Sequence, residues 1–164
     1  KEEDGDLNRV DLRQRQMCIR DRVKPYERMM LQAERAGLGL TMECNRDLPA
    51  VFADPDRIAQ VFINLLHNAI KFTPPGGHIQ MGAWIHDNTV VFMVRDNGVG
   101  IPQKDLTRIF ERFYKADRAR SGGGTGLGLS ICKHMVEAHG GYIWAESEEG
   151  RGSSLFFAIP IASA

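Results

Sequence analysis

The sequence predicts one α+β domain built as a two-layer α/β sandwich, in which helices lie on one face of a mixed, mostly antiparallel sheet. Three observations support this prediction. Helical and strand patterns are mixed along the chain without the strict alternation that builds a parallel sheet. Two strand patterns separated by residues 86–88 indicate an antiparallel hairpin. Residues 55–72 have the apolar stripe of a helix that packs on a sheet.

Composition narrows the class of protein. The chain has 164 residues, a length typical of a single domain, and 21 basic residues balance 21 acidic ones. A neutral chain has no overall field to attract nucleic acid or an anionic membrane. Its longest apolar runs, at 61–66, 90–94 and 155–161, are shorter than the roughly 18 residues of a membrane span. Three widely spaced cysteines favour a reducing compartment over a disulfide or zinc framework.

The location expected from these totals is the cytoplasm. We expect no contact of this chain with nucleic acid or with a membrane, although the parent protein can still be anchored in the inner membrane. Phosphate binding, if present, has to be local.

The N-terminal half is predicted element by element. Residues 1–9 are polar and are expected to lie outside the folded domain, which is expected to span 10–164. A helix is expected over 10–36, ended by Gly37, with short strands at 38–44 and 50–53. Asp54 as N-cap and Pro55 at the first helical position then predict a helix that continues to Phe72.

The C-terminal half continues with strands and short helices. We expect, in order, strands at 78–85 and 89–96, a glycine-punctuated loop at 97–102, a short helix at 103–109, a basic segment at 115–124, a helix at 126–138 and a closing strand pair at 141–147 and 153–160.

A polar stripe follows the long central helix. Gln60, Asn64, Asn68 and Lys71 are spaced by four, four and three residues, so they share one face. A solvated helix face is the alternative explanation. Asparagine is a mediocre helix former, however, and solvated faces are usually rich in Glu, Lys and Arg. Because amide oxygens can bind Mg²⁺ and lysine can neutralise phosphate, the stripe favours a ligand site.

Two glycine motifs follow. In "RDNGVGIP", Asp96 ends a buried strand and precedes Gly98 and Gly100, which suits a carboxylate that accepts from an adenine amino group; a simple turn is the alternative. "SGGGTGLGLS" (121–130) is no P-loop, because no lysine follows Gly128, and no dinucleotide fingerprint, because Leu129 replaces the third glycine. The next helix begins inside this stretch, so its free N–H groups can face phosphates.

Between these motifs stands "IFERFYKADRAR". Phe110 is expected in the core, and the aromatic group of Phe110, Phe113 and Tyr114 is expected to anchor a cationic lid that carries Lys115, Arg118 and Arg120. Such a lid can close over a polyphosphate.

Taken together, "INLLHNAIKFTP", "DNGVGIP", "FERFYKAD" and "GGTGLGL" resemble the N box, first glycine box, F box and second glycine box of the catalytic ATP-binding domain of sensor histidine kinases. The resemblance covers about residues 54–160 and implies a Bergerat-type fold that binds ATP with Mg²⁺. Carried over residue by residue, it implies that Asn68 is the magnesium ligand, that Lys71 and Lys115 contact phosphate, that Phe72 packs against adenine and that Asp96 reads its amino group. It further implies a pocket floor of Gly98, Gly100 and Ile101, and a triphosphate loop of Gly124, Thr125, Gly126, Leu127, Gly128 and Leu129.

The reaction is suggested by one position. ATP-hydrolysing relatives, the gyrases, heat-shock chaperones and mismatch-repair ATPases, have a Glu where this chain has Asn64, and an amide cannot serve as general base. The resemblance therefore implies transfer of the γ-phosphoryl to a histidine on the dimerisation domain of a homodimeric parent kinase, which serves a response regulator. Because no acceptor motif of the type H-E-x-x-T-P is present, this chain is expected not to phosphorylate itself. The resemblance then implies that residues 1–9 are a linker that follows missing dimerisation helices. An anti-sigma-type serine kinase and a nucleotide-sensing module without catalysis remain the alternatives.

Residues 13–22, "RQRQMCIRDR", depart from the amphipathic pattern expected of the first helix. One hypothesis is a foreign segment that replaces the normal stretch, and the other is a divergent, solvent-facing helix end.

Overall fold

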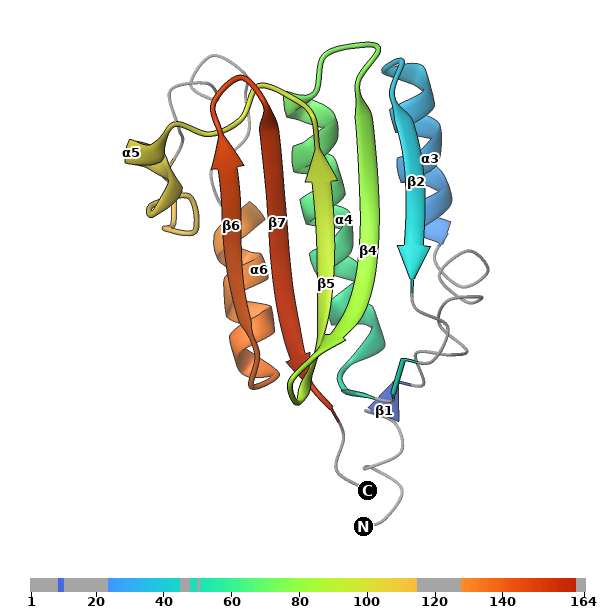
Figure 1. Cartoon of the computed structure of the whole chain (residues 1–164). Coiled ribbons are helices and arrows are strands. Elements are labelled where there is room, and N and C mark those ends of the chain that lie inside the picture. The colour runs from blue at the N-terminus through green and yellow to red at the C-terminus, as the bar shows by residue number, and fades with distance from the viewer. Residues whose placement is uncertain (1–8, 11–23, 45–47, 50, 115–127, 162–164) are drawn as a thin grey trace.

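The computed structural model describes residues 9–10, 24–44, 48–49, 51–114 and 128–161. They form a five-stranded sheet with the order β2-β4-β5-β7-β6, and α3, α4 and α6 lie together on one face of it (Figure 1). The larger elements are α3 (Lys24–Arg35), β2 (Gly39–Cys44), α4 (Pro55–Phe72), β4 (His78–His86), β5 (Thr89–Asp96), α6 (Gly128–Ala138), β6 (Tyr142–Glu148) and β7 (Gly152–Pro160). The predicted two-layer sandwich is confirmed.

The sheet is mixed but mostly antiparallel, as predicted. β2 runs parallel to β4, whereas β4 with β5, β5 with β7 and β7 with β6 are all antiparallel. The predicted hairpin is present, with His86 opposite Thr89 next to the turn. A separate two-stranded ladder joins β1 (Arg9–Val10) to β3 (Val51–Phe52).

Helix α4 begins and ends where the sequence predicts. The Asp54 carboxylate accepts hydrogen bonds from the backbone N–H groups of Asp56 and Arg57, at 3.0 and 3.4 Å, and Pro55 occupies the first turn. The opposite side of the helix packs on the sheet, where the Phe62 ring meets those of Phe92 and Phe157 edge-on at 5.4 and 5.1 Å. This packing fixes which side of α4 remains available for a ligand.

His139 ties α6 to the start of α4. Its Nε2 accepts a hydrogen bond from the backbone N–H of Asp54 at 3.0 Å, so Nδ1 carries the proton that is donated to the Met135 carbonyl at 2.6 Å. His139 is therefore a packing residue whose imidazole joins two helices.

The other face of the sheet is apolar as well. Trp144 stacks on Phe156 with ring centroids 5.0 Å apart, Tyr142 stacks on Trp144, and Trp84 meets Phe156 edge-on. Among the elements that the structure places, no helix lies over this face (Figure 1). These flat rings cover the small and aliphatic residues of β5 and β7, which explains why the β5 sequence is apolar on both faces.

Two predicted boundaries differ from the structure. The short helix expected at 103–109 is the single turn α5 (Gln103–Leu106), followed by turns. The helix expected over 10–36 is described as α3 from Lys24, and Val10, expected as its first residue, lies in strand β1 instead. Helix α6 is described from Gly128; its predicted start at 126 and the questioned segment 13–22 lie outside the described residues.

Candidate functional site

The polar stripe of α4 is partly engaged with α6. The side-chain Nε2 of Gln60 donates to Oδ1 of Asn64 at 2.8 Å, and Nδ2 of Asn64 donates to the carbonyl of Gly128 at 3.5 Å. Asn64 therefore links α4 to the first residue of α6. Asn68, one turn further along, is half-buried, and the exposed Lys71 places its ammonium 5.4 Å from the centroid of the Phe72 ring.

Asp96 is a buried carboxyl group at the end of β5. Only 6% of the residue is exposed, and Oδ1 accepts a hydrogen bond from the backbone N–H of Gly98 at 2.9 Å. The strand end is further fixed by Asn97, whose Oδ1 accepts from the backbone N–H of His78 at 2.7 Å. The orientation of the Asp96 carboxyl group is thus set by the loop that follows it.

Gly98 and Gly100 are required by the close approach of the protein's own backbone. A Cβ at Gly98 would lie 2.2 Å from the carbonyl oxygen of Phe72, which accepts from the N–H of Val99 at 3.1 Å. Gly100 has φ +73°, and a Cβ there would lie 2.2 Å from the carbonyl oxygen of Glu148. The loop at 97–102 therefore packs tightly between the end of α4 and the β6–β7 turn.

Ser147 closes the far side of this loop. Its hydroxyl accepts from the backbone N–H of Ile101 at 2.7 Å and donates to the carbonyl of Gly152 at 2.9 Å. Sequence reasoning missed both Ser147 and Asn97 as supports of the site. No spacing signal could have found Ser147, because its partner Ile101 is 46 residues away in the chain.

The start of α6 lies beside the amide stripe. Gly128 is exposed, and a Cβ built on it meets nothing within 4 Å. Leu129 is half-buried and packs against the core. The other candidates of the glycine stretch, Gly124, Thr125, Gly126 and Leu127, lie outside the described residues, as does Lys115.

Cys132 lies in the core behind this helix start. Burial raises the pKa of its thiol from 9.0 to about 12, and hydrogen bonding, including that with the Asn64 side chain, opposes the shift. The thiol also approaches the Val61 carbonyl at 3.8 Å. Cys132 is therefore a neutral packing residue between α4 and α6.

The aromatic segment is anchored by two of its three rings. The Tyr114 hydroxyl donates to Oδ1 of Asp105, a residue that is 3% exposed, and Phe110 packs against the core. Arg108 lies over the Tyr114 ring, with Cζ 4.4 Å from the centroid. Phe113, in contrast, is 66% exposed with φ +62°, so it does not serve as an anchor among the described residues.

In the described ranges, no group of three or more His, Cys, Asp or Glu side chains could hold a metal ion. None of the helices within those ranges is long and apolar enough to cross a membrane. His67 is exposed on α4.

Asn68 and Lys71 of the amide stripe, the buried carboxyl group and the glycine loop thus lie near the C-terminal end of α4. Residues 53–163, more than half of the chain, match the family described as histidine kinase-, DNA gyrase B- and HSP90-like ATPase. The chain belongs to this family.

Members of this family among curated proteins include close relatives of the chain. It is 47% identical over 120 residues to the sensor histidine kinase WalK of Bacillus subtilis, covering 71% of this chain and 20% of WalK. It is also 47% identical over 117 residues to the adaptive-response sensory kinase SasA of Synechococcus elongatus, covering 70% of this chain and 30% of SasA. The chain thus spans less than a third of these relatives, and it corresponds to their ATPase-type catalytic domain.

Solved structures of histidine kinases have the same fold as this chain. The catalytic domain of histidine kinase ThkA superposes with a TM-score of 0.75 at 33% identity, covering 93% of each chain. Full-length ShkA in complex with AMPPNP gives a TM-score of 0.76 at 32% identity, covering 94% of this chain and 31% of ShkA. The predicted resemblance to a histidine kinase catalytic ATP-binding domain is confirmed.

Proposed function

We propose that this chain binds ATP with Mg²⁺ as the catalytic domain of a sensor histidine kinase and transfers the γ-phosphoryl to a histidine on a dimerisation domain of its parent protein. The parent would be a homodimer that passes the phosphoryl group to a response regulator. One observation carries the proposal: the buried, oriented carboxyl group of Asp96 lies beside a loop whose glycines are packed against the end of the amide-bearing helix α4.

Asp96 is proposed to read the adenine. The Gly98 N–H holds Oδ1, and the carboxyl group so oriented accepts a hydrogen bond from the exocyclic amino group of the base. A buried acceptor that has to be matched by a donor discriminates against a base that lacks an amino group at this place. Phe72, half-buried at the end of α4, supplies an apolar surface for the base.

The last two turns of α4 and the start of α6 are proposed to hold the phosphates. Asn68 offers an amide oxygen to Mg²⁺, Lys71 offers a positive charge, and the N–H groups at the start of α6 offer donors and a positive dipole end. Bound Mg²⁺ would neutralise phosphate charge during transfer. ShkA, a structural neighbour, was solved with AMPPNP, which supports nucleotide binding by this fold. Roles for Lys115, Gly124, Thr125, Gly126 and Leu127 remain predictions.

Asn64 is proposed to favour a protein acceptor over water. Its amide is engaged by Gln60 and by the Gly128 carbonyl, and an amide cannot deprotonate water. Phosphoryl transfer to an imidazole needs alignment and charge neutralisation rather than a strong base. A structural neighbour, ThkA, was solved in complex with the response regulator TrrA, which supports a similar partner here. A cytoplasmic location follows from ATP as substrate.

Calorimetric titration of the chain with ATP tests the nucleotide half of the proposal. We expect binding with MgCl₂ present and weaker binding after chelation with EDTA, together with no acid-labile label on the chain after incubation with γ-labelled ATP. Absence of ATP binding would overturn the proposal, and acid-labile label would contradict the missing acceptor.

A test of γ-phosphoryl transfer needs an acceptor histidine. A dimerisation domain from a relative can supply this histidine in trans. A labelled acceptor histidine supports the proposal, whereas steady release of inorganic phosphate without labelling would assign an ATPase instead.

A further inference from the structure

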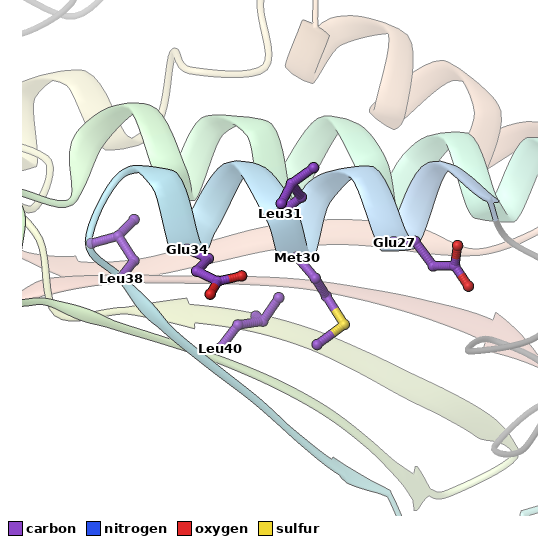
Figure 2. Close-up of a pocket in the computed structure, with 6 residues that line it drawn as sticks. All are labelled: Glu27, Met30, Leu31, Glu34, Leu38 and Leu40. Carbon is purple, nitrogen blue, oxygen red and sulfur yellow. The ribbon is translucent and has the colours of Figure 1, made fainter.

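An apolar groove that includes none of the proposed ATP residues lies between α3 and β2. It has a volume of about 400 Å³ and is lined by Glu27, Met30, Leu31, Glu34, Leu38 and Leu40. Figure 2 shows Met30 between the two glutamates along α3, with its side chain directed toward Leu40 of β2. β2 is an edge strand, so the groove opens at the margin of the sheet. The groove is thus accessible to a partner.

The groove exposes large apolar side chains to solvent. Met30 and Leu31 are 42% and 45% exposed at adjacent positions of one helix, and Leu40 lies beside them on β2. Single exposed apolar residues are ordinary, whereas a contiguous apolar patch with a polar rim marks interaction sites. Methionine adds adaptability, because its flexible thioether fits different partners.

The fold does not need the side chains of Met30 and Leu31 for its own packing. Met29 and Ala33, four residues apart on the neighbouring stripe of α3, are buried and pack α3 against the core. Met30 and Leu31 therefore lie outside the stripe that attaches the helix to the sheet. Their apolar character is explained better by a partner than by folding.

The rim of the groove is acidic and spaced along the helix. Glu27 and Glu34 are seven residues apart, one turn before and one turn after the apolar pair, which separates them by about 10 Å along the axis. Both are exposed, and neither forms an ion pair with another residue of the described ranges. The groove therefore presents two carboxylates that a basic partner can neutralise.

We propose that this groove binds an amphipathic helix of a partner polypeptide, with an apolar pair at its centre and Lys or Arg about one turn to each side. A helix laid along α3 brings its own residues seven positions apart opposite Glu27 and Glu34, which an extended strand, with its longer rise per residue, does not. Helices pack at axial distances of 8–10 Å, so such a partner can fill the space beside α3 and over Leu40. The inference does not rest on ATP binding.

The test begins with a selection. A phage library of helical peptides about 20 residues long, long enough to hold a helix, is selected on the intact chain. We expect enriched peptides to carry an apolar pair flanked by Lys or Arg about seven positions apart. Failure to enrich any peptide, or enrichment of acidic or uncharged ones, overturns the proposal.

Variants then locate and explain the binding of an enriched, fluorescein-labelled peptide by fluorescence anisotropy. Leu31→Asp is expected to weaken binding by about tenfold or more, whereas the matched control Ile85→Asp, at a residue that is 43% exposed outside the groove, leaves it unchanged. The charge-reversed double variant Glu27→Lys/Glu34→Lys is expected to lose the basic peptide and to bind the same peptide with its basic residues changed to Glu. Circular dichroism of each variant checks folding, so that a lost signal is assigned to the groove.

Two further results would overturn the proposal. Binding that survives Leu31→Asp in a folded chain places the peptide elsewhere. Sedimentation that shows a dimer dispersed by Leu31→Asp assigns the groove to a second copy of the chain instead of a partner helix.

Discussion

The backbone N–H of Gly98 donates a hydrogen bond to Oδ1 of Asp96 over 2.9 Å, where β5 ends and the chain passes close to the carbonyl oxygen of Phe72. This bond helps to orient a buried carboxyl group through the backbone of the loop. The orientation depends on the path of the loop, and the loop depends on glycines that leave room for the end of α4.

Asp96→Asn tests the reading of adenine. The amide keeps an oxygen for Gly98 but turns an NH₂ donor toward the amino group of the base, so we expect the dissociation constant for ATP to rise about tenfold or more, on the order of 1–3 kcal/mol. Isothermal titration calorimetry measures it. Asp87→Asn, in the exposed turn between β4 and β5, serves as control. Equal ATP affinity in both variants would remove Asp96 from the site.

Gly98→Ala tests the close approach of the loop to α4. The added Cβ lies 2.2 Å from the Phe72 carbonyl oxygen, so either the loop or the helix end has to move. We expect a loss of about 1–3 kcal/mol or more in the free energy of unfolding. Gly128→Ala, where the Cβ meets nothing within 4 Å, is the matched control for stability. Thermal unfolding without nucleotide compares the two variants. Equal melting temperatures would contradict the close approach of Gly98 to the Phe72 carbonyl.

Asn68→Ala tests the magnesium site. The residue is half-buried on the polar stripe and lies apart from the core, so we expect the Mg²⁺-dependent part of ATP binding to disappear while the free energy of unfolding changes by less than about 0.5 kcal/mol. Titrations with and without EDTA separate the two parts. A large loss of stability without nucleotide would instead assign Asn68 a structural role.

Tyr114→Phe tests the anchor of the aromatic segment. It leaves the buried Asp105 without the hydroxyl that donates to Oδ1, while Oδ2 already has no hydrogen-bond partner in the described part of the chain. We expect a loss of about 1–3 kcal/mol in the free energy of unfolding. A double-mutant cycle with Asp105→Asn, followed by urea denaturation, isolates the pair, and additive effects would show that the two residues are uncoupled.

Cys132 is predicted to be unreactive in the folded chain. Because burial raises the pKa of its thiol to about 12, almost no thiolate exists at pH 8, and alkylation by iodoacetamide should reach it only after unfolding. Folding favours the protonated thiol, so stability should decrease as pH rises from 9.0 toward about 12. Mass spectrometry of Cys132 peptides measures the labelling, and Cys132→Ala removes this thiol from the alkaline titration. Rapid labelling of the native chain would contradict the burial.

Local sequence patterns correctly predicted most of the described helices and strands. The limits of α4 follow from Asp54, Pro55 and the apolar stripe, since capping and periodicity act within one or two turns. The β4–β5 hairpin follows for the same reason, from two strand patterns around a short turn. The predicted C-terminal end of α5 was wrong by a few residues, because turn-rich segments set helix ends only weakly by sequence.

The sequence by itself determined the fold class, the amide stripe, the strand-end carboxyl group and the order of the four motifs, because each lies within a short stretch whose periodicity or turn chemistry is local. Only the tertiary structure decided that Gly98 and Gly100 leave room for the backbone at Phe72 and Glu148. It also decided that Ser147 accepts a hydrogen bond from Ile101 and that Asn64 donates one to Gly128. These partners are far apart in the chain, so the contacts exist only once packing of the core has brought the elements together.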